Sequence, residues 1–244
     1  LELAIDWILA EMKSDGLENV HGEEVMVPKW VRGNESAELV QPYRKKLPML
    51  GLGRSIATPS EGIEAEIVVV GSYDELETRK NEVKNKIVLF DVPFTTYGET
   101  VKYRYGGASA AAKQGAVASL IRSIAPFSMS TPHTGGMSYE EEIRKIPHAA
   151  LTLEDATLLH RLQDRGEKPI VRLYMEAHFE PDVPSRNIIA ELKGTELPEE
   201  IIVVGAHIDS WDVGQGAHDN AGGCVAAWEA VRILKKLGFR PRRT

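Results

Sequence analysis

"IIVVGAHIDSWDVGQGAHDNAGG", residues 201–223, combines an apolar run with two histidines, three aspartates and five glycines. The apolar run predicts a short buried strand over residues 201–207. The glycines predict a loop, and the apolar spacing that follows predicts a helix over 221–237. A strand, a glycine-rich loop and a helix form one half of an open α/β sheet, in which ligands bind at the carboxyl ends of the strands.

Three side chains of this stretch have the chemistry of a metal site. His207 stands where the predicted strand ends, and Asp209 returns to the same face two residues later. The Asp209 carboxylate can accept the other imidazole N–H, as partners of metal-bound histidines do. Asp219 stands just before the predicted helix, where a carboxylate is stabilised. An imidazole and a carboxylate suit zinc, and a carboxylate with two oxygens can bridge two ions.

A structural interpretation of the same residues stays open at this point. An Asp before a helix is usually an N-cap, so Asp219 can serve the backbone alone. His207 can be a hydrogen-bonded histidine at a strand end. Asp212 and His218 fit turn positions, and Trp211 fits packing under the loop. Spacing alone therefore does not choose between a zinc site and a structural loop.

Other chemistries lack their signatures. The glycine spacing does not match the dinucleotide fingerprint, a P-loop would need a Gly-Lys-Ser/Thr end, and no G-x-S-x-G elbow is present. The single cysteine, Cys224, excludes an intrachain disulfide and is expected to lie in a buried helix as a small hydrophobic residue.

Composition indicates a folded globular protein with a sizeable core. The chain has 244 residues, of which 43% are hydrophobic and 27% charged. The formal net charge is −7 and no basic stripe forms, which argues against a nucleic-acid partner. The longest apolar runs are much shorter than the ~20 residues of a membrane span, so we expect none.

The flanking sequence predicts further elements in two parts. Residues 1–14 have helical spacing, and residues 23–33 and 37–43 resemble the strands of a hairpin around "GNES". Asn34 opens an N-x-S triplet, a candidate glycosylation site if the chain is secreted. From residue 53 to about 177, short apolar strands alternate with helices. A proline-punctuated linker is expected over 178–185, followed by a strand over 186–194.

The opening stretch resembles the first half of the metal site in the co-catalytic zinc exopeptidases, the aminopeptidase and glutamate carboxypeptidase group. The segments "LGLGRSIATP", "ASLIRSIAPFS", "TPHTG" and "WEAVRILKKLGFRPRRT" extend this resemblance over nearly the whole chain. It implies an α/β fold: a partial exopeptidase sheet domain, interrupted by an inserted mixed α/β protease-associated domain. The implied ranges are 1–52 and 179–244 for the peptidase domain and 53–178 for the insertion.

The resemblance also implies a function. His207 would bind one of two zinc ions, Asp219 would bridge both, and Asp209 would orient His207. The reaction would be zinc-assisted hydrolysis of unblocked dipeptides and short peptides, as a carboxypeptidase or dipeptidase. Members of this group are secreted or lysosomal glycoproteins and can form homodimers, so we expect the same locations and partners here.

The implied site is incomplete within these residues. The resemblance places the general-base glutamate, an adjacent glutamate ligand, a further aspartate and a last histidine after Thr244. We therefore expect this polypeptide alone to bind zinc weakly and to be inactive. A second hypothesis is a peptidase-like binding protein that has lost its chemistry, but the presence of both His207 and Asp219 favours the enzyme.

Overall fold

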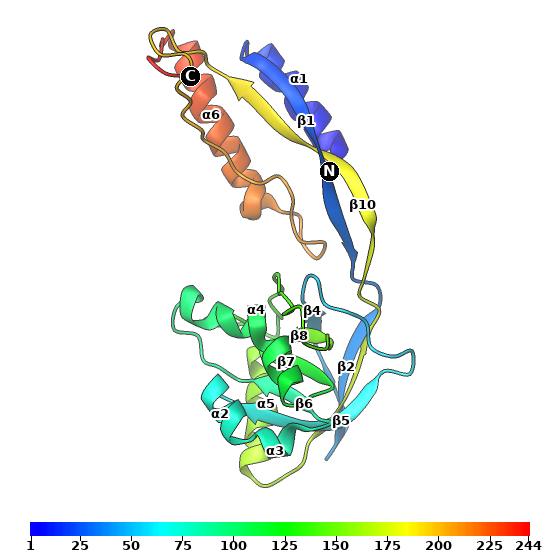
Figure 1. The fold of residues 1–244 in the computed structure, drawn as a ribbon. Coiled ribbons are helices and arrows are strands. Elements are labelled where there is room, and N and C mark those ends of the chain that lie inside the picture. Colours follow the sequence, from blue (N-terminus) through cyan, green and yellow to red (C-terminus); the bar gives the residue numbers. More distant parts are fainter. The chain divides into compact units, whose positions relative to one another are not determined.

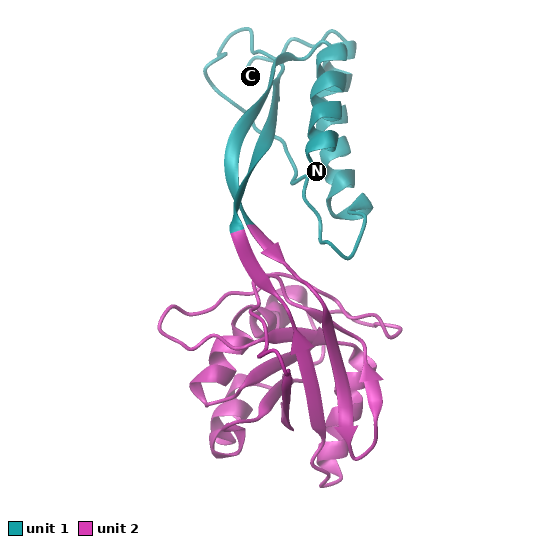
Figure 2. Cartoon of the chain, turned by 90° about the vertical axis from the view of Figure 1, so that its right-hand side faces the viewer, with its two compact units in different colours: residues 1–28, 181–244 teal, residues 29–180 magenta.

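The computed structural model describes residues 1–244 and confirms a mixed α/β chain. The chain forms two compact units, one of residues 1–28 and 181–244 and one of residues 29–180 (Figure 2). The larger unit is continuous in sequence and interrupts the smaller one. That it is a protease-associated domain stays a prediction.

The larger unit is built on one eight-stranded sheet with the order β3-β2-β9-β5-β6-β7-β8-β4 (Figure 1). Strands β5 to β8 run parallel, and the flanking pairs are antiparallel. The two edge strands are separated in the chain by Pro48 alone, so the sheet curls until its edges come together. The strands are β2 (Glu35–Gln41), β3 (Lys45–Leu47), β4 (Met49–Gly51), β5 (Ile63–Val70), β6 (Ile87–Phe90), β7 (Ala118–Arg122), β8 (His148–Leu151) and β9 (Ile170–Met175).

Helices cover both faces of this sheet, which explains why β6 to β8 read as continuous apolar runs. Side chains alternate along a strand, so Ile67 and Val69 of β5 join one core with Leu159 of α5, while Val68 and Val70 join another with Ala108 of α4. The helices are α2 (Tyr73–Thr78), α3 (Lys80–Val83), α4 (Tyr97–Lys113) and α5 (Leu153–Asp164).

The smaller unit contains a two-stranded ribbon and two long helices (Figure 1). Asn19 contacts Glu191 and Glu23 contacts Asn187, so the two strands run in opposite directions. The helices meet where Trp7 packs edge-on against Trp228, with ring centroids 5.9 Å apart. The elements are α1 (Glu2–Ser14), β1 (Glu18–Val31), β10 (His178–Glu191), the π-helical turn η1 (Ala217–Gly222) and α6 (Gly223–Lys236).

Three predictions about local structure are wrong. Residues 201–207 form no strand: no other strand pairs with them, and Val203 is 84% exposed. The predicted hairpin does not form, because β1 pairs with β10 while β2 pairs with β3 and β9. The predicted linker 178–185 is part of β10. Its prolines are tolerated because β10 has a partner on one side only, which leaves the other edge without ladder hydrogen bonds.

The predicted helices over 1–14 and 221–237 are confirmed as α1 and α6, with ends one or two residues away. The apolar side of α6 is partly exposed: Val225 is 57% exposed and Ile233 is 44% exposed. None of the helices is both long enough and apolar enough to cross a membrane.

Candidate metal centre

The structure brings His207 and Asp219 together in the smaller unit. Nε2 of His207 lies 3.0 Å from Oδ1 of Asp219. Nδ1 of the same ring lies 3.2 Å from Oδ1 of Asp209 and 3.0 Å from the Asp209 carbonyl oxygen. The imidazole ring therefore lies between two aspartates, with Asp209 at Nδ1 and Asp219 at Nε2.

Gly216 explains how the loop returns Asp219 to His207. Its φ of +64° is a left-handed conformation that glycine adopts without a steric penalty. A side chain there would also place a Cβ 2.5 Å from the Cβ of Ser210. The loop can therefore fold back on residue 210 only with glycine at 216, and η1 then presents Asp219 next to the imidazole.

The surroundings of His207 favour its charged form. Its pKa is raised, chiefly because the Asp209 carbonyl accepts a hydrogen bond from the ring and further because the carboxylates of Asp209 and Asp219 are negative. Desolvation of the ring opposes this shift, although the site is open: His207 is 53% exposed and Asp219 is 75% exposed. A metal ion would have to displace the proton from Nε2.

The donor pair fits zinc in type and spacing. Imidazole nitrogen and carboxylate oxygen are two of the common zinc donors, and two ligands ~2.1 Å from a tetrahedral ion lie roughly 3.4 Å apart. The observed 3.0 Å is within a few tenths of an ångström of that separation. However, no group of three or more His, Cys, Asp or Glu side chains in the chain is placed to hold a metal. The pair therefore supplies two donors of the kind that zinc binds, fewer than a complete zinc site needs.

The structure bears on the interpretations of Asp219, His218 and Cys224 as structural residues. Asp219 does not cap α6, since the N-cap is Gly222 and no side chain caps that end. The His218 side chain is exposed and makes no hydrogen bond or ion pair with His207 or Asp219. The expectation of a buried Cys224 is wrong: it is partly exposed, and its Sγ donates a hydrogen bond to the His207 carbonyl 3.1 Å away. Nothing in the sequence signalled this contact.

Comparison with known proteins points to one family. Residues 187–244 match peptidase family M28. Carboxypeptidase Q from Xenopus laevis is 51% identical over the whole of this chain, which covers 52% of that protein. The chain thus spans about half the length of the curated relatives it matches.

Solved structures agree with this assignment. The crystal structure of a peptidase M28 precursor from Shewanella amazonensis is 36% identical with a TM-score of 0.92, over 99% of this chain and 56% of that one. A zinc aminopeptidase from Bacillus subtilis shares the fold at 23% identity and a TM-score of 0.66, over 96% of this chain and 52% of that one. The chain is therefore homologous to carboxypeptidase Q from end to end, and its residues 187–244 carry the match to the M28 peptidases.

Proposed function

We propose that this chain is part of a zinc-dependent exopeptidase that hydrolyses unblocked dipeptides and short peptides, with two zinc ions in the complete site. The observation that carries the proposal is the 3.0 Å approach of His207 Nε2 to Asp219 Oδ1. Both residues lie within the segment that matches the M28 peptidases. Homology to carboxypeptidase Q supports the reaction class.

Each of the three side chains has a separate task in this proposal. Asp209 accepts the hydrogen bond from Nδ1 of His207, which orients the ring so that Nε2 would bind the ion once its proton is displaced. Asp219 would hold the ions through its carboxylate, whose two oxygens can serve two ions. Zinc bound there would lower the pKa of a water molecule and polarise the scissile carbonyl.

The 244-residue polypeptide contains two of these ligands, which is half of what one tetrahedral zinc takes. We propose that by itself it binds zinc weakly and does not hydrolyse peptides. The remaining ligands and the general base would come from the part of the relatives that this chain does not cover.

The locations and partners implied by the resemblance are also proposals. We propose a secreted or lysosomal protein that can form homodimers and carries sugar on Asn34. The Asn34 residue is exposed, and its backbone N–H donates to Oε2 of Glu176, so its turn is held at the surface.

The test of the peptidase function is dipeptide hydrolysis by the protein recovered from the cells that produce it. We expect release of free amino acids from an unblocked dipeptide, loss of activity with a zinc chelator and recovery on adding zinc. An N-acetylated and a C-amidated dipeptide serve as matched substrates. No hydrolysis of the unblocked dipeptide by the zinc-loaded protein would overturn the proposal.

A further inference from the structure

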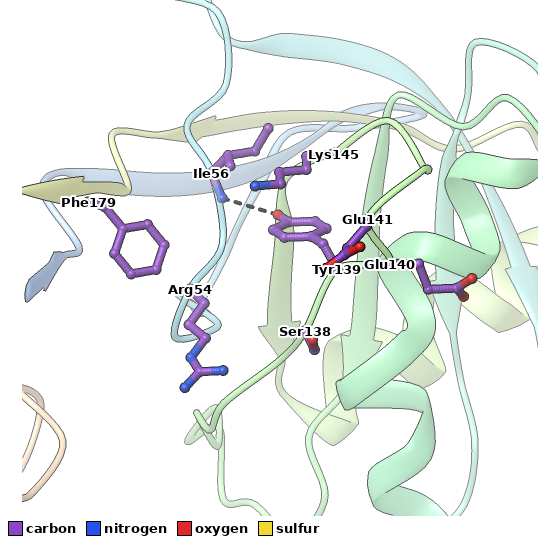
Figure 3. A pocket seen from close by; sticks show the side chains of 8 residues that line it. All are labelled: Arg54, Ile56, Ser138, Tyr139, Glu140, Glu141, Lys145 and Phe179. Carbon is purple, nitrogen blue, oxygen red and sulfur yellow. Dashed lines mark hydrogen bonds between the residues drawn. The ribbon is translucent and has the colours of Figure 1, made fainter. Parts of the chain in front are cut away.

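The larger unit contains a pocket that the proposed function does not use (Figure 3). Its volume of about 390 Å³ is within the range of small-molecule sites. Residues from three separate parts of the unit line it: Arg54 and Ile56, residues 138–141 with Lys145, and Phe179.

Two cations at this pocket have no acidic partner in the protein. The Arg54 side chain makes no hydrogen bond or ion pair. The Lys145 ammonium lies 5.6 Å from the centre of the Tyr139 ring and meets no carboxylate. Each of these unpaired cations can attract a carboxylate, which Arg can bind with two parallel hydrogen bonds.

The backbone holds Arg54 in a rare conformation. Its φ is +79°, which costs a residue other than glycine of order 1 kcal/mol. Both neighbours are anchored: Gly53 N–H donates to Gly135 O at 2.9 Å, and Ser55 N–H donates to Leu52 O at 2.9 Å. These hydrogen bonds fix the backbone on both sides of Arg54, and Figure 3 shows its side chain extending from this turn on the side away from Tyr139.

One acid at the pocket is also unpaired. Glu140 is neutralised by Lys113, whose Nζ lies 2.9 and 2.7 Å from its two oxygens. Glu141 makes no ion pair, so its carboxylate remains free for a positive group. The pocket thus offers cations and an anion at the same time.

Two aromatic side chains complete the lining. The Tyr139 hydroxyl accepts a hydrogen bond from Ile56 N–H at 3.2 Å and donates one to Ile146 O at 2.7 Å, which fixes the ring. Phe179 is 51% exposed and faces the pocket from the other side in Figure 3. Rings in this arrangement favour an apolar or aromatic group between them.

We propose that this pocket binds a zwitterionic peptide or amino acid with an aromatic side chain. The carboxylate of the ligand would pair with Arg54, and its ammonium with Glu141. Its side chain would pack against Tyr139 and Phe179. The binding is independent of the metal centre, because no zinc ligand lines the pocket.

The experiment is calorimetric titration of the 244-residue chain with alanyl-phenylalanine, with a chelator present so that no metal can hold the peptide. N-acetyl and C-amide forms of the dipeptide and free phenylalanine are titrated alongside. We expect one binding site and about fivefold to tenfold weaker binding for each blocked form, which lacks one charge. The comparison of dipeptide with phenylalanine shows which of the two is the occupant.

Variants assign each charge to its residue. Asn tolerates positive φ, so Arg54→Asn should keep the turn. It should weaken the binding of the free and N-acetyl dipeptides but not that of the C-amide form. Glu141→Gln should weaken the binding of the free and C-amide dipeptides but not that of the N-acetyl form. Matched controls are Arg44→Asn and Glu142→Gln, both at exposed positions outside the pocket.

Two results would overturn the proposal. One is equal binding of free and blocked dipeptides, or equal effects of Arg54→Asn and Arg44→Asn. The other is loss of binding in a His207→Ala chain, which would place the peptide at the metal centre. Circular dichroism of each variant establishes that it is folded.

Discussion

The Nε2 atom of His207 lies 3.0 Å from Oδ1 of Asp219, although a glycine-rich loop separates the two residues in sequence. The loop makes this approach possible through Gly216, whose left-handed backbone and close contact with Ser210 leave no room for a side chain. A hydrogen bond between an imidazole and a carboxylate is common in proteins. Here the second nitrogen of the ring also lies within hydrogen-bond distance of Asp209, a contact that metal-bound histidines commonly make.

The first prediction concerns zinc binding by the 244-residue chain. We expect weak binding that is at least about tenfold weaker still in His207→Ala and in Asp219→Asn, because each substitution removes one of two ligands. His218→Ala is the matched control and should bind as the wild type does. Calorimetric titration measures all four proteins, and tight binding of two ions by this polypeptide would show that the site is complete without further ligands.

The second prediction concerns His148, which is completely buried in β8. Desolvation lowers its pKa from 6.5 to about 4, even though its ring nitrogens lie 3.1 and 3.2 Å from the carbonyl oxygens of Ser119 and Arg104. The unfolded chain therefore takes up this proton at higher pH than the folded chain does. The contribution of the neutral His148 ring to the unfolding free energy is complete above about pH 6.5, declines as the pH falls and is lost below about pH 4.

The difference between 6.5 and about 4 corresponds to roughly 3 kcal/mol of unfolding free energy. Urea denaturation of the 244-residue chain at several pH values measures it. His148→Gln should be less stable at neutral pH but should lose less stability on acidification, whereas His21→Gln at an exposed position should follow the wild type. Identical pH dependence in His148→Gln and the wild type would contradict the assignment.

The third prediction concerns Gly107, in the middle of α4. A Cβ there would meet ring atoms of Phe90 at 3.0 and 3.2 Å, and Phe90 is fully buried between other aromatic rings. Gly107→Ala should therefore lower the unfolding free energy by about 1–3 kcal/mol, although alanine favours helix more than glycine does.

Gly98 provides the control within the same helix. A Cβ at Gly98 would meet no heavy atom within 4 Å. Gly98→Ala should be neutral or stabilising by up to about 1 kcal/mol, since only helix propensity changes. Thermal melts compare the two variants, and equal effects would show that contact with Phe90 does not limit position 107.

The fourth prediction concerns Asn34. Expression in a secretory system should give a protein whose mass falls on treatment with an N-glycosidase, because the triplet Asn34-Glu35-Ser36 lies at the surface. Asn34→Gln should abolish the shift, and Asn187→Gln, outside any such triplet, should leave it unchanged. An unchanged mass of the wild type would contradict the prediction.

The sequence was sufficient where local patterns and final contacts agree. The amphipathic helix of residues 1–14 and the buried strands of the larger unit were predictable because their periodicities match the faces they bury. The strand predicted over residues 201–207 was wrong because its local pattern and its contacts disagree. The apolar run has strand character, but a strand also needs a hydrogen-bonded partner strand, and none pairs with these residues. The β1–β10 ribbon was missed because its strands are distant in sequence and β10 contains prolines.

The candidate site was predictable in its residue types but not in its geometry. The spacing of His207 and Asp209 suggested that both lie on one face, and the 3.2 Å contact now seen agrees with that expectation. The position of Asp219 depends on the fold-back at Gly216, which a pattern of glycines indicates only in general terms. The unpaired charges of Arg54 and Glu141 could not be predicted, since pairing depends on tertiary contacts.

Native mass spectrometry of the protein from its natural source tests the central claim most directly, because one spectrum gives both the length of the polypeptide and its bound metal. The account predicts a chain longer than 244 residues that carries two zinc ions and loses them to a chelator. A polypeptide of 27.0 kDa, before any sugar, that carries no zinc would contradict it. In that case His207 and Asp219 would not be part of a zinc exopeptidase site.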